Sequence, residues 1–307
     1  MMPDSPKVSI GLPVYNGENY LGEAIESILG QTYQNIEIVI TDNASVDRTR
    51  EICEKYAAVD DRVKYFRNKH NLGAAPNFNK SFEFATGKYF KWMAHDDILV
   101  PTFVEKCVTI LEENPDVVLC YSSTSVINNK GEVIKDYDFS GRTNSPNLQQ
   151  RFAALLLSSD MCYEIFGLIR SNLLAQTSLM GNFGHGDGVL LSRLSLEGRF
   201  YEIPENLLRV RSHEEQSLAS YAGTDKYGRP DYHSYTQWFD SSKKGKLIFP
   251  NWRILYEFFK TPWQVHLKLS DRAYCHFHLV RWGKRHWRYL VGDINVAVRQ
   301  VVSHGSH

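Results

Sequence analysis

Short apolar runs alternate with amphipathic segments along the first 121 residues. Runs rich in β-branched residues predict buried strands, whereas apolar residues spaced three or four positions apart predict helices. Leu21, Ala24, Ile25, Ile28 and Leu29, for example, fall on one face of a helix. We expect strands at residues 7–13, 36–41, 63–67, 89–93 and 117–121, and helices at residues 20–29, 47–57, 75–85 and 101–113.

Strands that alternate with helices are usually joined by right-handed crossovers into a mostly parallel sheet with helices on both faces. The pattern therefore predicts an α/β fold. Beyond residue 121 we expect a hairpin that turns at residues 128–131, a polar loop at 136–150 and helices on both sides of a buried segment at 166–169. Strands are expected at 199–203 and 206–211, weak periodicity at 214–249 and helices at 250–303.

Composition excludes several classes of protein. The 307 residues include 35 basic and 35 acidic side chains, so the overall charge gives no reason to expect nucleic-acid binding. The five cysteines are scattered and never spaced as C-x-x-C, which indicates buried thiols rather than a disulfide or zinc framework. The first residues do not resemble a secretory signal, and no apolar run approaches the ~18 residues of a membrane span. We expect a cytoplasmic protein, at most peripheral at the inner face of a membrane.

Two adjacent carboxylates, Asp96 and Asp97, follow an aromatic-rich run at the end of a predicted buried strand. They repel each other unless a positive group lies beside them. Open α/β sheets bind ligands at the carboxyl ends of their strands. A divalent cation that also holds a diphosphate would stabilise the pair, because hard cations prefer carboxylate and phosphate oxygens. Alternatively, the pair caps the helix that begins near Pro101.

Polar residues also follow the first two strands. Pro13, Tyr15 and Asn16 end the first strand, and Asp42 and Asn43 end the second, where a nucleotide could bind. An acidic residue at such a position can accept a hydrogen bond from a base or a ribose. Taken alone, Asp42 is better explained as a turn former or a helix N-cap.

Glycine-containing motifs narrow the chemistry further. Asn71 and Gly73 either form a simple turn or let the backbone approach a bound donor closely, which glycine permits. The first strand is not followed by G-x-G-x-x-G, which disfavours a dinucleotide oxidoreductase. The sequence also lacks a G-x-S-x-G elbow, so no covalent nucleophile is indicated.

Together these motifs resemble the family 2 glycosyltransferases, which are inverting enzymes with the GT-A nucleotide-sugar-binding fold. The resemblance extends over residues 8–213 and rests on VSIGLPVYNGENYLGEAIESILGQTYQNIEIVITDNASVDRTREI and NKHNLGAAPNFNKSFEFATGKYFKWMAHDD. It implies a catalytic domain at 1–213, with a donor half at 1–121 and an acceptor half at 122–213. A C-terminal extension at 214–307 would be mostly helical from about residue 250.

The resemblance also implies roles for the acidic residues. The family's D-x-D element appears here as His95-Asp96-Asp97, with Ala94 where many members carry an earlier Asp. By analogy Asp96 faces the ribose, and Asp97 binds Mn²⁺ or Mg²⁺ together with His213, since imidazole can also bind such ions. Asp42 weakly favours a UDP- or dTDP-linked donor. The implied donor site comprises Pro13, Tyr15, Asn16, Asp42, Asn43, Asn71, Gly73 and Asp96.

A catalytic base is expected at the start of a helix on the acceptor side. Asp187 matches that position, with Gly186 where relatives often carry Glu. A carboxylate within ~3 Å of the acceptor hydroxyl could take its proton as the oxygen attacks. Asp187 could instead be only a helix cap, and His185 is a second candidate for the base or for an acceptor contact.

The implied reaction moves a sugar from a nucleotide diphosphate to an acceptor hydroxyl by single displacement, in polysaccharide, glycolipid or cell-surface glycan synthesis. The acceptor would be a glycan or a lipid-linked molecule. A sugar nucleotidyltransferase would carry a glycine-rich, basic loop where this chain has LPVYNGENYL. An inactive nucleotide-sugar-binding scaffold is the other alternative, and the four retained acidic residues disfavour it.

The C-terminal segment has an apolar stripe bordered by basic residues. A basic, aromatic amphipathic helix can lie on an anionic membrane, so residues 263–303 could make peripheral membrane contact. The stripe could instead pack against the catalytic domain or against a partner subunit in a homo-oligomer. Its residues are Ala273, Phe277, Val280, Trp287, Val291, Ile294 and Val298, with Lys284 interrupting them.

Overall fold

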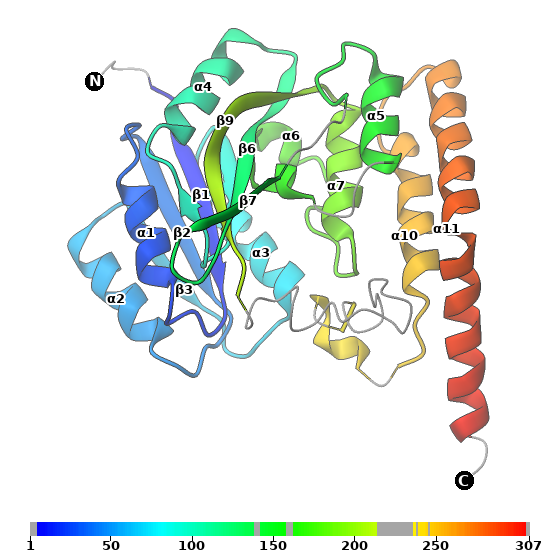
Figure 1. Ribbon diagram of the computed structural model, residues 1–307, viewed down its shortest axis with the longest axis horizontal. Coiled ribbons are helices and arrows are strands. Elements are labelled where there is room, and N and C mark those ends of the chain that lie inside the picture. The colour runs from blue at the N-terminus through cyan, green and yellow to red at the C-terminus, as the bar shows by residue number, and fades with distance from the viewer. Residues whose placement is uncertain are drawn as a thin grey trace.

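A computed structural model describes most of the chain (Figure 1). The described residues are 5–137, 142–157, 162–213, 236–237, 239–244 and 246–304. The weakly periodic segment expected at 214–249 therefore lies largely outside the described residues.

The donor half is built on four parallel strands in the order β3-β2-β1-β4. Alternate residues of β1, such as Val8 and Ile10, enter a core with the helices α1, α2 and α4. Helix α3 covers the opposite face, and it packs so closely that a side chain at Gly11 would lie 2.4 Å from Ser81 Oγ. The elements are β1 Val8–Val14, α1 Leu21–Leu29, β2 Ile36–Asp42, α2 Thr49–Val59, β3 Val63–Arg67, α3 Ala74–Glu83, β4 Tyr89–Trp92 and α4 Phe103–Glu113.

The sheet continues into the acceptor half through antiparallel pairs. Strand β8 pairs antiparallel with both β4 and β6, and β9 then pairs parallel with β6 and antiparallel with β5. The α/β fold is confirmed, and its parallel pairs lie mainly in the donor half. The elements are β5 Ile98–Leu99, β6 Val117–Ile127, β7 Val133–Tyr137, α5 Leu148–Leu157, η1 Tyr163–Phe166, β8 Leu168–Arg170, α6 Ser171–Leu174, α7 Gly186–Ser195 and β9 Arg199–Arg211.

Most predicted elements are confirmed, with boundary differences that have local causes. The predicted hairpin is present, because β6 and β7 pair antiparallel around a turn in which Gly131 has a φ of 81°. The loop predicted at 136–150 is wrong at its two ends, where β7 reaches Tyr137 and α5 begins at Leu148. The two strands predicted at 199–203 and 206–211 form one continuous strand, β9, whose register with β6 shifts near Ser123.

The C-terminal helices pack on the acceptor half. They share a core with α5 and α7, in which Phe152 and Phe183 contact a cluster that includes Phe258 and Trp282. Figure 1 shows α10 and α11 side by side, beyond α7 and away from the sheet. Within the described part of the chain, no helix is both long and apolar enough to cross a membrane. The elements are η2 Ser241–Lys243, α10 Pro250–Lys260, η3 Thr261–Trp263 and α11 Leu269–His304.

Candidate active site

The paired carboxylates lie in the turn between β4 and β5. Asp96 and Asp97 are both buried, with exposed fractions of 7% and 2%. The Nε2 atom of His213 lies 3.0 Å from an Asp96 carboxylate oxygen. The structure therefore brings His213 to Asp96, the neighbour of Asp97, although the two residues are 117 positions apart in sequence.

The two-residue strand β5 accounts for this meeting. Ile98 and Leu99 pair with Arg209 and Leu208, which lays the end of β9 beside the carboxylates. The backbone N–H of Arg211 then donates to Asp97 Oδ1 at 3.0 Å. We did not expect β5 from the sequence, because two residues are too few to show a period.

Arg211 is a buried residue beside the acidic turn that sequence reasoning missed. Its side chain is 1% exposed, and its Nε donates to the backbone oxygen of Asp96 at 2.9 Å. Its Nη2 forms an ion pair with Glu23 at 2.6 Å, and the guanidinium lies over the Tyr20 ring. Arg211 thus ties the acidic turn to α1. In the sequence Arg211 is one charged residue among the alternating polar and apolar residues of a strand, which does not indicate that it is buried.

The electrostatics of the acidic pair favour a cation. Burial raises the pKa of Asp97, and the neighbouring charge of Asp96 raises it further. Burial also acts to raise the pKa of Asp96, but the hydrogen bond with His213 and the charge of His95 outweigh it, so that pKa lies below its ordinary value. Two carboxylates and an imidazole are a donor set that suits Mn²⁺ or a similar ion. These residues therefore fit the implied metal.

Asp42 lies at the end of β2 and has no exposed surface. Its Oδ1 accepts the backbone N–H of Ser45 at 2.8 Å, which is the turn-forming role. Its Oδ2 accepts hydrogen bonds from Tyr65 at 2.8 Å and from Arg67 at 3.0 Å. Direct contact between Asp42 and a nucleotide remains a prediction. Tyr65 and Arg67 would influence that contact, because both donate hydrogen bonds to Asp42.

Asn43 connects the end of β2 to the loop before α3. Its amide donates to Asn71 Oδ1 at 2.9 Å and to the carbonyl of Gly73 at 3.0 Å. Gly73 has a φ of 90°, and a Cβ there would lie 2.5 Å from the carbonyl oxygen of Phe239. The close approach that requires this glycine is thus made by the chain's own backbone. Contact between a donor and Asn71 or Gly73 stays a prediction.

The loop after β1 completes the donor side. Pro13 pairs with Thr41 in the parallel register, and Tyr15 is 42% exposed. Asn16 has a φ of 52°, and its Oδ1 accepts the backbone N–H of Val46 at 3.0 Å. The structure therefore places the ends of β1, β2 and β4 along one edge of the sheet, which is the arrangement expected of a nucleotide site.

Asp187 lies in the first turn of α7, as expected for the base. Its Oδ1 accepts the backbone N–H of Gly188 at 2.7 Å. The Nδ1 atom of His185 is 3.9 Å away, and His185 itself has a left-handed φ of 68°. Cys162 joins these two residues in a group whose ligand atoms lie within 4.8 Å of one another, a juxtaposition that the sequence did not indicate.

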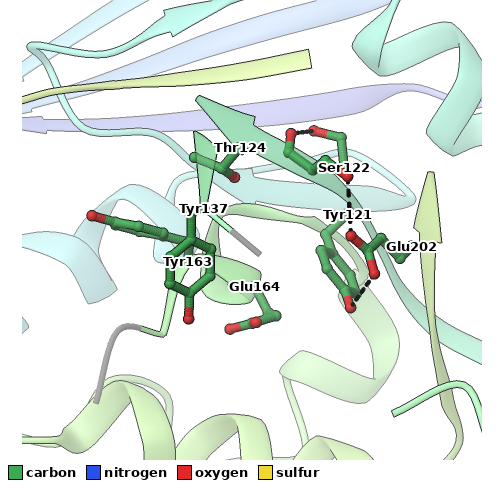
Figure 2. Close-up of a pocket in the computed structure, with 8 residues that line it drawn as sticks. Tyr121, Ser122, Thr124, Tyr137, Tyr163, Glu164 and Glu202 are labelled. Atoms are coloured by element: carbon green, nitrogen blue, oxygen red, sulfur yellow. Dashed lines mark hydrogen bonds between the residues drawn. The ribbon is translucent and has the colours of Figure 1, made fainter. Parts of the chain in front are cut away.

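Two residues of the short helix η1 are affected by the charges of the candidate site's acids. Burial raises the pKa of Tyr163, and the charge of Asp97 adds to the effect. Burial raises the pKa of Glu164 to about 8, with contributions from the charges of Glu202 and Asp187. In Figure 2, Tyr163, Glu164 and Glu202 line a small cavity together with residues of β6. Glu164 is thus a second carboxyl close to the expected base.

Replacing Glu164 with glutamine should remove a pH dependence of stability. The folded protein holds Glu164 protonated up to about pH 8, whereas the unfolded chain releases that proton near pH 4.5. The free energy of unfolding of the wild type should therefore fall as pH rises between these values, by at most about 1.4 kcal/mol per pH unit from this residue. Urea unfolding at several pH values should show a flatter profile for Glu164→Gln.

The matched control is Glu132→Gln, because Glu132 lies on the exposed hairpin turn. This control should keep the pH profile of the wild type. Identical profiles for Glu164→Gln and the wild type would contradict the assignment of a protonated, buried Glu164.

A family model described as glycosyl transferase family 2 matches residues 9–176, more than half of the chain. The chain belongs to glycosyl transferase family 2. The matched range includes Asp42, Asp96 and Asp97 and stops before Asp187 and His213. The predicted family is thereby confirmed.

Relatives of this family 2 chain include an uncharacterized glycosyltransferase of Haemophilus influenzae. The two are 31% identical over 225 residues, which cover 72% of this chain and 70% of the relative. Among solved structures, TarS of S. aureus in complex with UDP superposes with a TM-score of 0.63 at 16% identity, covering 92% of this chain and 72% of TarS. The mannosyltransferase PcManGT of Pyrobaculum calidifontis, in complex with GDP-Man and Mn²⁺, gives 0.53 at 16% identity, covering 96% and 88%. At these identities the structural likeness shows the GT-A fold.

Proposed function

We propose that this family 2 glycosyltransferase is a metal-dependent, inverting enzyme that moves a sugar from a nucleotide diphosphate to an acceptor hydroxyl. The observation that carries the proposal is the contact between Asp96 and His213, beside Asp97, at the carboxyl end of β4. TarS is known in complex with UDP, and PcManGT in complex with GDP-Man and Mn²⁺, which supports a nucleotide donor and a cation here. The pathway we propose is the cytoplasmic assembly of a polysaccharide, glycolipid or cell-surface glycan.

Each half of the site has its own task in this reaction. Asp97 and His213 would hold the cation, which would supply electrostatic stabilisation of the negative charge on the leaving diphosphate. Asp96 binds the ribose, while the loops that contain Tyr15 and Asn71 enclose the nucleotide.

On the acceptor side, Asp187 orients the acceptor hydroxyl and takes its proton as the oxygen attacks the anomeric carbon. The start of α7 suits this task, because the backbone N–H of Gly188 already fixes one oxygen of Asp187 and leaves the other for the acceptor. Attack on the face opposite the diphosphate inverts the anomeric centre in one step.

Nucleoside diphosphates should stabilise the protein only when the cation is present. With UDP, dTDP or GDP at about a hundred times its dissociation constant, linkage predicts a rise in Tm of roughly 5 °C. A thermal-shift series with each nucleotide, with and without Mn²⁺, measures this rise and identifies the base that is bound. The rise should disappear on addition of EDTA.

The same series separates the alternatives. An inactive scaffold would show the Mn²⁺-dependent rise but would neither hydrolyse nor transfer any nucleotide sugar. A nucleotidyltransferase would instead release pyrophosphate from a nucleoside triphosphate and a sugar phosphate. No shift with any of the three diphosphates would contradict the proposed donor site.

A further inference from the structure

Helix α11 carries two apolar faces, and the structure buries only one of them. Cys275, Leu279 and Trp282 belong to the core shared with α5 and α7, and Leu290 is buried farther along the helix. The stripe predicted from the sequence lies on a different side of α11, exposed to solvent. Its members include Phe277, Val280, Trp287, Ile294 and Val298, with exposed fractions of 57%, 72%, 53%, 44% and 55%.

An aromatic row on α10 and η3 extends this exposed surface. Trp252, Tyr256, Phe259 and Trp263 recur at helical spacing and are 43–60% exposed. The row adjoins α11, since Trp252 Nε1 donates to the carbonyl of Leu290 at 2.9 Å and the Phe259 ring lies 4.4 Å from that of His276. We call the row and the exposed stripe of α11 together the outer face.

The charge around the outer face is strongly positive. Residues 250–304 contain nine lysines and arginines but three acidic residues, in a chain whose formal net charge is zero. Of the three acids, Asp293 is buried and accepts hydrogen bonds from Asn251, and Glu257 is ion-paired with Arg253 and Lys260. The guanidinium groups of Arg272, Arg281 and Arg288 lie over the rings of Trp263, Phe277 and Trp287.

We propose that the outer face binds the surface of an anionic lipid membrane. Exposed tryptophan and tyrosine side chains suit the boundary between head groups and acyl chains, and the surrounding cations suit anionic head groups. Each cation near such a surface adds to the attraction, so several together give strong binding that salt weakens. The proposal does not depend on the transfer reaction, because it concerns a face remote from the acidic turn.

Charge complementarity favours lipid over a second copy of this chain. Pairing two outer faces through α11 would bring Arg281, Lys284 and Arg288 of one copy close to the same residues of the other. Like charges so placed would repel each other, with no acidic row on the face to compensate. An anionic membrane can accommodate the apolar stripe at the boundary of its acyl chains and the basic border at its head groups.

The buried faces of α10 and α11 contact the acceptor side of the candidate site. The His185 ring, two residues from Asp187, lies 5.9 Å from the Phe258 ring of α10, and Phe258 lies 5.7 Å from Trp282 of α11. Docking α10 and α11 on lipid would therefore hold the base one helical layer from the membrane.

Flotation of the full chain with vesicles tests the proposal. The protein should float with vesicles that contain phosphatidylglycerol, should float less at high salt and should stay at the bottom with pure phosphatidylcholine. The charge variant Arg281→Gln, Lys284→Gln, Arg288→Gln should lower the partition coefficient about a hundredfold. The apolar variant Val280→Ser, Trp287→Ser, Ile294→Ser should lower it by at least about tenfold.

Matched controls make the same number of apolar or charge changes elsewhere on the surface. The apolar control is Val59→Ser, Val133→Ser, Ile134→Ser, and the charge control is Lys55→Gln, Lys130→Gln, Lys135→Gln, all at exposed positions. Both controls should float like the wild type. A wild type that does not bind anionic vesicles overturns the proposal. A stable dimer in sedimentation that the apolar variant dissociates, without vesicle binding, would assign the face to a second copy instead.

Discussion

Sugar transfer should fall by about 10²–10⁴-fold when Asp187 is replaced by asparagine, because the acceptor hydroxyl then has no group to take its proton. Asparagine has nearly the same shape, and its Oδ1 can still accept the Gly188 N–H that the carboxylate accepts at 2.7 Å. The fold and the nucleotide site should therefore survive. Initial rates with saturating nucleotide sugar, measured beside the Mn²⁺-dependent thermal shift, separate the two effects.

The matched control for this variant is Asp61→Asn, at an exposed position between α2 and β3. It should transfer sugar at the wild-type rate. Turnover by Asp187→Asn within a few-fold of the wild type would rule out Asp187 as the base and would direct attention to Glu164, the other carboxyl in its neighbourhood.

Replacing Asp97 with asparagine should weaken Mn²⁺-dependent donor binding by at least about a hundredfold, because the cation loses an anionic ligand. The same change should not destabilise the protein without metal. Burial and the Asp96 charge raise the pKa of Asp97, so the carboxylate becomes more costly to the folded state as pH rises. A neutral amide avoids that cost and can still accept the Arg211 N–H.

Thermal melts with and without Mn²⁺ and UDP should show both the loss of donor binding and the undiminished stability of the metal-free protein. The metal-free Tm of Asp97→Asn should equal or exceed that of the wild type above about pH 5, while the shift with Mn²⁺ and UDP should be lost. His213→Gln should lose less of the shift, because one neutral ligand is removed. An unchanged Mn²⁺ titration for Asp97→Asn would exclude Asp97 as a metal ligand.

The sequence could predict the donor half because each element there carries its own periodic signal. The runs of β1 and β2 are mostly apolar and buried throughout, as expected for strands covered on both faces, and α1 has one clear apolar side. The acceptor half was harder to predict, because its pairing depends on contacts between distant segments. Strand β5 is two residues long, yet its pairing with β9 places the end of β9 beside the acidic turn.

The site shows the same division between local and distant information. Asp96, Asp97 and Asp187 could be found from short motifs and from the family resemblance. Arg211 and Glu164 could not, because an arginine in a strand and a glutamate beside a loop have no pattern that reveals a buried position. The stripe on α11 was predicted correctly as apolar, but only the structure showed that a different face of that helix meets the core.

The shared core of α5, α7, α10 and α11 has a consequence for how this family could diversify. Because Phe258 and Trp282 complete the packing around Phe152 and Phe183, the helix that bears Asp187 is held in place by residues from the last sixth of the chain. Exchanging acceptor preference between relatives by recombination would therefore require moving this whole helical unit together. The parallel strands β1 to β4 could be inherited separately, as an independent module.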